Sequence, residues 1–274
     1  MKRELGIARC GLACCLCSEN STCPGCRGEG CKDKDFCENR RCSMEKGLQG
    51  CFECPDTACR KGLLVKSKPL GFTEYVRRFG TEQLLDRLEE NEKAGAVYHR
   101  RGIFGDYDEF ETVEEVISYI DILSKPFQVR DTSHLSDGEI MLRLKRATPA
   151  DLKRRFLPAY HFDICLTDGT PVGVCDLRIG HSRKLYIGGN IGYTVFPPYR
   201  GHHYARKACL LLFAFAKEHG LNYLIITCVP DNLPSRCTLE GLPGKMLEIA
   251  DIPEDHEMYA EGKRQVCVFR YDLD

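Results

Sequence analysis

Twelve of the chain's 18 cysteines lie between Cys10 and Cys59, and this density limits what the first part of the chain can fold into. Three cysteine pairs have two residues between them, a spacing that lets a tight turn aim two thiolates at one tetrahedral ion. Apolar residues are too sparse in this segment to build a core. Bound metal would therefore supply the folding free energy that burial does not.

The same cysteine density would indicate a disulfide scaffold in a secreted protein. The first residues contain no apolar stretch long enough for a signal peptide, and no other run is long enough to cross a bilayer. We therefore expect a cytoplasmic protein without a membrane partner. Thiols that stay reduced in that compartment favour metal binding over disulfides.

No histidine occurs before His99, so a metal site within this segment uses thiolates alone. Four thiolates in a closed shell are typical of structural zinc, whereas iron–sulfur clusters usually show a denser single run of ligands. Zinc is favoured, with iron–sulfur as the alternative, and two or three ions are predicted. Cys15 is expected not to bind, because it adjoins Cys14. The predicted ligands are Cys10, Cys14, Cys17, Cys23, Cys26, Cys31, Cys37, Cys42, Cys51, Cys54 and Cys59.

The motifs C-G-L-x-C-x-x-C from Cys10 to Cys17, C-P-G-C, and C-x-x-C-x4-C ending at Cys59 stand in fixed order. This pattern resembles a small Cys-rich domain family of bacteria and archaea for which zinc binding is assumed. The resemblance covers about residues 5–65. The family's function is unknown, so the resemblance implies no activity.

The composition changes after residue 65, where cysteines stop and helical patterns begin. Apolar residues spaced three and four apart predict helices near 72–79 and after Thr81, and a capping box at Thr112 and Glu115 predicts a third. Residues 99–107 are expected to form a loop, and Lys125-Pro126 to mark a boundary. The predicted domains are a Cys-rich zinc module at 1–65, a helical extension at 66–128, and a third domain at 129–274.

The third predicted domain alternates strand and helix patterns. Its order predicts an α+β fold with a mixed, mostly antiparallel sheet and flanking helices. The expected strands are 140–146, 161–166, 172–179, 191–196, 223–227, 246–250 and 266–271, and the expected helices begin at Thr148-Pro149 and run from Tyr204 to His219.

The stretch R-G-H-H-Y-A at residues 200–205 lies between an expected strand and an expected helix. A strand, a tight turn and a helix N-terminus present several free backbone N–H groups around one point. Together with the helix dipole, they favour an anion such as a pyrophosphate. We therefore predict an anion site at this turn.

This order of elements, with P-x-Y-R-G-x-x-Y-A at its centre, resembles the Gcn5-related N-acetyltransferase (GNAT) superfamily over roughly residues 138–274. The resemblance implies that acetyl-CoA lies in a V-shaped gap between the strand before the loop and the strand after the helix. Loop amides would bind the pyrophosphate, and strand amides would hold the pantetheine. The implied cofactor-binding residues are Val195, Phe196, Arg200, Gly201, His202, His203, Tyr204, Ala205, Asn232 and Ser235.

Two positions depart from the GNAT pattern. His203 replaces the middle glycine of the family's loop, so the phosphate site must tolerate a Cβ atom. Its side chain either donates to a phosphate or faces outward. Many members carry a tyrosine as general acid where this chain has Leu239. The thiolate then leaves unaided, or Tyr193, Tyr204 or Tyr259 assists.

A general base must take a proton from an ammonium whose pKa is near ~10. Asp176 and Arg178 alternate on one strand face, so both either enter an acceptor cleft or face solvent. Glu240 and His202 are further candidates. The predicted catalytic residues are Tyr193, Tyr204 and Asp176.

The sequence thus predicts an acetyl-CoA-dependent N-acetyltransferase whose zinc module places the substrate or a partner. The acceptor is an amine of a small molecule or a protein. The alternative is a non-catalytic zinc-binding interaction protein with a CoA-binding GNAT-like domain. The net charge of −1 provides no basic field, which argues against a nucleic-acid partner.

Overall fold

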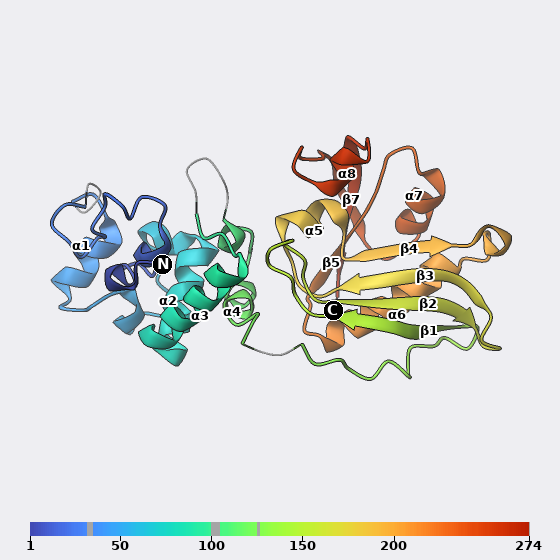
Figure 1. Cartoon of the computed structure of the whole chain (residues 1–274), viewed down its shortest axis with the longest axis horizontal. Coiled ribbons are helices and arrows are strands. Elements are labelled where there is room, and N and C mark those ends of the chain that lie inside the picture. The colour runs from blue at the N-terminus through green and yellow to red at the C-terminus, as the bar shows by residue number, and fades with distance from the viewer. Residues whose placement is uncertain (32–34, 100–104, 125–126, 274) are drawn as a thin grey trace. The chain divides into compact units, whose positions relative to one another are not determined.

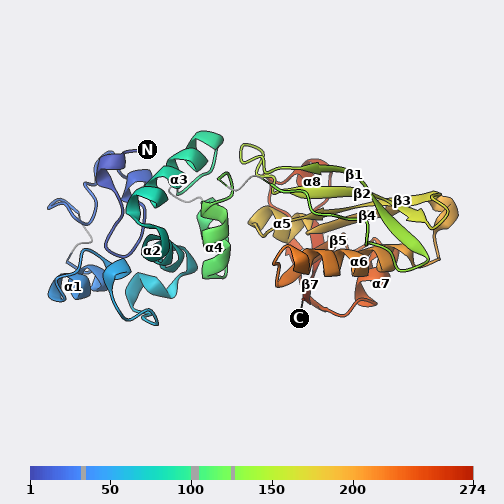
Figure 2. The same ribbon diagram turned by 90° about the horizontal axis from the view of Figure 1, so that it is seen from below.

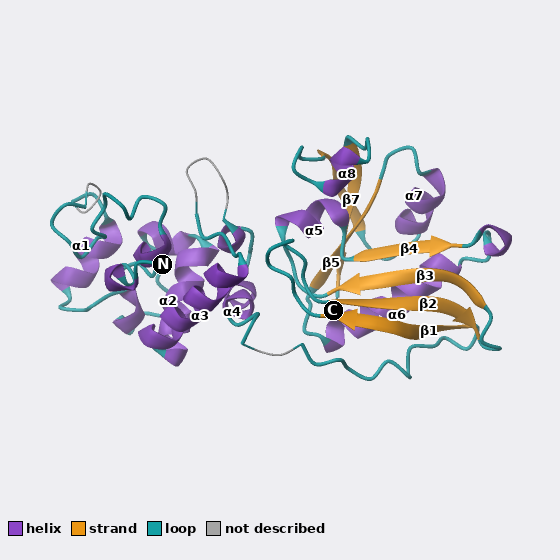
Figure 3. Ribbon diagram, viewed as in Figure 1, coloured by secondary structure: helices purple, strands orange, loops and turns teal. Residues whose placement is uncertain are grey.

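The computed structural model describes residues 1–31, 35–99, 105–124 and 127–273 (Figure 1). The chain divides into two compact units, Met1–Pro126 with Leu152–Arg154, and Phe127–Asp151 with Arg155–Asp274. Helices dominate the first unit and strands the second (Figure 3). The expected boundary at Lys125-Pro126 and positions 100–104 of the expected loop lie outside the described residues. No helix in the described ranges is long and apolar enough to cross a membrane.

The first unit holds the cysteine-rich segment and a group of helices. The three predicted helices are confirmed, and the third begins at the expected capping box, where the Glu115 amide donates to Thr112 Oγ1 over 3.2 Å. A short helix within the cysteine-rich segment, α1, carried no recognisable apolar period. The helices are α1 (Glu38–Glu45), α2 (Ser67–Phe79), α3 (Thr81–Ala94) and α4 (Val113–Ile120).

Apolar faces of α2, α3 and α4 form the core of the first unit, with Phe72, Leu84 and Val116 fully buried. Gly71 lets α2 approach α4 closely, because a Cβ at this position would lie 2.6 Å from the Val116 Cβ. The burial of these side chains accounts for the helical period read from the sequence.

The second unit contains two antiparallel sheets. Among the described residues, one sheet has the strand order β1-β2-β3-β4 and the other the order β5-β7-β6. The expected hairpins are confirmed, including the turn at Gly169, where φ is +88°. The strands are β1 (Ile140–Thr148), β2 (Ala159–Leu166), β3 (Pro171–Arg178), β4 (Ile191–Val195), β5 (Tyr223–Cys228), β6 (Lys245–Asp251) and β7 (Gln265–Asp272).

Helix α6 (Tyr204–Glu218) lies along one face of the four-stranded sheet (Figure 2). Its buried residues Cys209, Leu212 and Phe215 pack with alternate residues of the strands in one core. Strand β6 forms an edge of its sheet, and Met246, Leu247 and Ile249 on it are each more than a third exposed.

The prediction that a helix begins at Thr148-Pro149 is wrong. Thr148 belongs to β1 and pairs with Ala159 of β2. The intervening residues must reverse the chain within a short span, and they form turns with a bridge between Asp151 and Phe156. The strand ladder therefore outcompetes the local helix-start signal. Three further helices were not predicted: α5 (Arg183–Gly188), α7 (Leu233–Glu240) and α8 (Glu257–Ala260).

His219, just after α6, packs against aromatic rings, and burial lowers its pKa to about 4. Its ring centroid lies 5.2 Å from that of Tyr160 and 4.9 Å from that of Phe215. Histidine in the unfolded chain has a pKa of ~6.5 and therefore takes up a proton before folded His219 does. The free energy of unfolding consequently decreases as the pH falls from that value toward 4. His219→Phe should remove about 2 kcal/mol of this acid destabilisation, less than the full shift implies because the ring retains solvent contact. Urea denaturation of wild type and variant at pH 7 and pH 4.5 measures how far the free energy of unfolding falls between the two pH values. A variant with the same pH dependence as wild type would contradict this prediction.

Candidate functional site

Strands β4 and β5 belong to different sheets and do not pair with each other as a ladder, and we call the separation between these two strands the gap. Asn190, which is fully buried, joins the two strands at the closed end of this gap. Its main-chain N–H donates to Ile225 O over 2.5 Å, and its side-chain Oδ1 accepts from the Ile225 N–H over 2.9 Å. The strands therefore part from a fixed point just before β4 begins.

The side chain of Asn190 also replaces a main-chain bond on the β3 side. Its Nδ2 donates to Arg178 O over 3.1 Å and to Gly180 O over 2.7 Å. The Asn190 main-chain N–H is therefore available for β5. This role of Asn190 was not predicted from the sequence. The available signal was a polar residue at the start of an apolar strand, in the stretch G-G-N-I-G-Y.

The alternation of hydrogen bonds along β4 indicates which of its amides face the gap. The Phe196 amide donates to Val172 O in β3 over 2.9 Å. Alternate positions point the other way, so the amides of Tyr193 and Val195 are directed toward the β5 side. Phe196, which was predicted to offer its backbone to the cofactor, therefore does not present its amide to the gap, whereas Val195 does.

The predicted anion loop follows β4 and leads into α6. A 3₁₀ turn at Pro197–Tyr199 comes first, and the Arg200 Nε donates to Val195 O over 3.2 Å. Gly201 has φ of +86°, and His203 is the N-cap of α6 with φ of +60° and ψ of 17°. The loop thus needs a left-handed backbone where the GNAT pattern has glycine, and His203 adopts it at a cost of roughly 1–2 kcal/mol. The first-turn amides of α6 lack partners within the helix.

The side chains of Tyr193, on β4, and Ser235, on α7, contact each other. Their hydroxyl oxygens lie 2.9 Å apart, and burial raises the pKa of Tyr193 above its ordinary value. Asn232 caps α7, since its Oδ1 accepts from the Ser235 amide over 3.2 Å. The Asn-x-x-Ser motif therefore starts the helix that positions Ser235 opposite Tyr193.

Asp176 lies on β3 beside Gly192 of β4, where a Cβ would come within 2.6 Å of the carboxylate. Burial raises its pKa, although Arg178 and His161 act in the opposite direction. Arg178 Nη2 lies 3.0 Å from Asp176 Oδ2. Oδ2 makes no further hydrogen bond within the described structure, so the ion pair with Arg178 is its polar contact there.

The other candidate groups are less suitably placed. Tyr204 is buried at the start of α6, and its ring stacks with that of His202 at 5.4 Å. Leu239, in the tyrosine slot, is 1% exposed, and its carbonyl accepts from the Tyr271 hydroxyl over 2.8 Å. Glu240 pairs with Arg236 on the surface. Tyr259 lies in α8, where Arg264 stacks on its ring.

The eleven predicted metal ligands are all free thiols, with Cys10 and Cys51 buried and the others partly exposed. Burial in the first place, and the nearby thiols of Cys37, Cys26 and Cys14, raise the pKa of Cys10 to about 12. Within the described part of the chain, however, no three histidine, cysteine or acidic side chains converge as they stand to hold a metal ion. Zinc binding therefore remains a prediction.

Comparison with known structures gives matches of low overlap. They include a GNAT-family acetyltransferase from Bacillus anthracis (21% identity, 41% of this chain and 66% of that one, TM-score 0.34). Another is a ribosomal-protein-S5-alanine acetyltransferase from Vibrio fischeri (18% identity, 42% and 62%, TM-score 0.35). The chain thus spans less than two thirds of the length of these proteins. TM-scores this low carry no inference about this chain.

No curated protein matches the chain. A family model described as an acetyltransferase (GNAT) domain matches residues 110–242. The matched residues include β1 to β5, the parting of β4 from β5, the loop before α6, and α7. Over residues 110–242 the chain is therefore similar to GNAT acetyltransferase domains.

Proposed function

We propose that this protein transfers the acetyl group of acetyl-CoA to a primary amine. The observation that carries the proposal is the parting of β4 from β5, which are joined at Asn190, together with the left-handed loop between the end of β4 and the start of α6. In this proposal the pyrophosphate binds the amides of residues 201–205, and the pantetheine passes the Tyr193 and Val195 amides. Arg200, Gly201, His202, His203, Tyr204, Ala205, Asn232 and Ser235 border the bound cofactor.

The proposed chemistry needs a donor for the developing oxyanion and an acceptor for one proton. Main-chain amides of β4 are rigid donors, and one such donor is commonly worth roughly 3 kcal/mol. As the amine nitrogen bonds to the thioester carbon and the C–S bond breaks, the Asp176 carboxylate takes the proton that the amine loses. The Tyr193 hydroxyl, which shares a hydrogen bond with Ser235, is placed to protonate the leaving thiolate.

The cysteine-rich segment completes the proposal. We propose that it binds zinc through thiolates and places the acceptor or a partner. Its C-x-x-C spacing and the proximity of Cys14, Cys26 and Cys37 to Cys10 support this role. The alternative of a non-catalytic interaction protein is not favoured, because the family match falls on an acetyltransferase domain.

Acetyl-CoA should stabilise the protein. At a hundred times its dissociation constant, a ligand that binds only the folded state adds about 2.7 kcal/mol. Arg200→Glu combined with Gly201→Asp should abolish this stabilisation, because both substitutions place negative charge at the proposed phosphate site. Differential scanning fluorimetry with and without acetyl-CoA measures the shift in Tm.

The matched control is Lys263→Glu combined with Gly262→Asp. It changes the charge equally and alters a glycine with the same φ of +86° and equally open surroundings. This control should keep the full shift. A wild-type protein with no shift at saturating acetyl-CoA would refute the proposal. If acetyl-CoA does shift the Tm, measuring thiol release from acetyl-CoA across a panel of amines would identify the class of the acceptor.

A further inference from the structure

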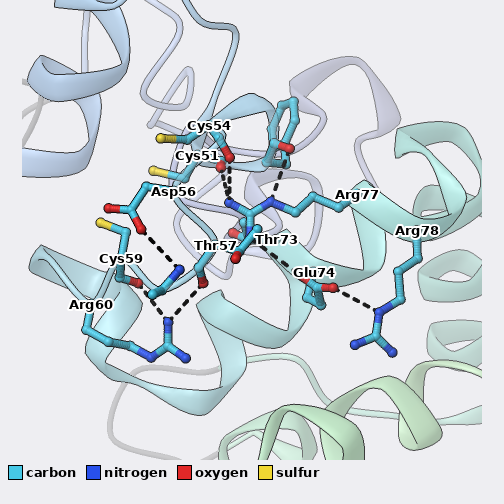
Figure 4. Close-up of polar contacts among 12 residues, drawn as sticks. Cys51, Cys54, Asp56, Thr57, Cys59, Arg60, Thr73, Glu74, Arg77 and Arg78 are labelled. Atoms are coloured by element: carbon cyan, nitrogen blue, oxygen red, sulfur yellow. Dashed lines mark hydrogen bonds and ion pairs between the residues drawn. The ribbon is translucent and has the colours of Figure 1, made fainter.

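One pocket of the first unit is lined by four cysteines that come from separate parts of the sequence. Cys42 lies on α1, Cys51 is the first residue of a 3₁₀ turn that ends just before Cys54, and Cys59 follows later in the chain. In Figure 4 the sulfur atoms of Cys51, Cys54 and Cys59 project to the same side of their segment. The pocket has a volume of about 40 Å³. We call these four residues the thiol pocket.

The backbone of the thiol pocket is held by Arg77 from α2. Arg77 Nη2 donates to Cys51 O over 2.8 Å and to Cys54 O over 3.2 Å, and its Nε donates to Phe52 O over 3.3 Å (Figure 4). The Arg77 side chain is only 13% exposed. One guanidinium thus fixes the turn that carries two thiols, which lowers the entropic cost of gathering ligands around an ion.

Two donors face sulfur atoms of the thiol pocket. Asn39 Nδ2 lies 3.7 Å from Cys51 Sγ, and Lys46 Nζ lies 3.7 Å from Cys54 Sγ. Asn39 is itself held in place, because its Oδ1 accepts from the Leu63 amide over 2.8 Å. Hydrogen-bond donors to sulfur, and a nearby cation, stabilise thiolates and offset the negative charge that four of them bring to one ion.

We infer that Cys42, Cys51, Cys54 and Cys59 bind one zinc ion together as a four-thiolate site. The inference rests on the proposed zinc binding of this segment and specifies which cysteines share an ion. The thiols do not yet converge on a point. A cysteine sulfur changes its position by rotation about χ1 between staggered angles, and such a rotation leaves in place the backbone that Arg77 holds. Zinc, which has no strong geometric preference of its own, accepts the tetrahedral shell that results.

Differential alkylation of the wild-type full chain tests this grouping without a destabilising substitution. The reduced protein is treated with iodoacetamide after zinc loading or after EDTA, and each cysteine is quantified by mass spectrometry. Zinc should slow the alkylation of all four pocket thiols at least tenfold, and as a group. The exposed thiol of Cys237 should react equally in both samples. Any pocket thiol that reacts equally fast with and without zinc overturns the inference.

Zinc content gives a second measure. Cys54→Ser and Cys59→Ser should each hold one zinc ion fewer per chain than wild type, whereas Cys237→Ser should lose none. Equal zinc content in all variants, or iron with a visible absorption band in place of zinc, overturns the inference. The acetyl-CoA shift in Tm is measured on the same samples. A failed zinc test with an intact shift rejects the zinc site alone, and a lost shift in wild type rejects the acetyltransferase proposal.

Discussion

Asp176→Asn is expected to lower kcat about 10²- to 10⁴-fold while leaving acetyl-CoA binding unchanged, because a positioned general base contributes a factor of this size. The amide keeps the shape of the carboxylate beside Gly192 but accepts no proton from the amine. Initial rates of thiol release at saturating amine measure the loss. Asp163→Asn is the matched control, since Asp163 lies on the neighbouring strand in ion pairs with Arg143 and Lys145.

The pH dependence of kcat in the wild type follows from the burial of Asp176, which raises the pKa of this carboxyl. Wild-type kcat should fall as the pH drops through the raised pKa, because only the carboxylate accepts a proton. The fold favours the protonated form, so the free energy of unfolding decreases as the pH rises from the ordinary to the raised pKa. Asparagine removes that penalty, and the variant should be no less stable at pH 7. A kcat within threefold of wild type would rule out Asp176 as the base.

Asn190→Ala is expected to reduce the free energy of unfolding by about 3–5 kcal/mol. The truncation removes three side-chain hydrogen bonds and leaves the Arg178 and Gly180 carbonyls and the Ile225 amide without partners. Each buried unpaired group costs about 1–3 kcal/mol. Urea denaturation should show a lower midpoint with an unchanged slope.

Asn222→Ala provides the comparison for Asn190, because the Asn222 side chain is exposed. Its effect should stay within about 0.5 kcal/mol, as for other surface substitutions. The Asn190 variant should also bind acetyl-CoA more weakly, since the closed end of the gap is no longer fixed. A loss of stability below 1 kcal/mol would show that the join between β4 and β5 does not depend on this side chain.

Local patterns in the sequence predicted most of the regular structure. Alternating apolar residues marked β2 and β3, and the capping box at Thr112 marked the start of α4. Each of these elements buries one face against a core, so its apolar residues recur with the period of the strand or helix and can be recognised from neighbouring residues alone. The false helix at Thr148 arose where β1 continued through a local helix-start signal. Short helices such as α5 were missed because six residues cannot show a helical period.

Parts of the candidate site depend on contacts between distant residues, which no local pattern encodes. The loop at 200–205 was found from its motif, and the left-handed backbone of His203 accounts for the glycine that the motif usually has there. The role of Asn190 requires knowing that Ile225 lies beside it. Likewise, nothing in the spacing from Cys42 to Cys51 indicates that both line one pocket. Such groupings become visible only in the folded chain.

The exposed apolar residues of β6 affect how the melting experiments must be designed. A strand at a sheet edge offers unpaired N–H and C=O groups to another chain, and Met246, Leu247 and Ile249 add apolar surface to that edge. Self-association through such an edge makes Tm depend on protein concentration. Titrations with acetyl-CoA should therefore be repeated across a tenfold dilution series, so that ligand binding and self-association are separated.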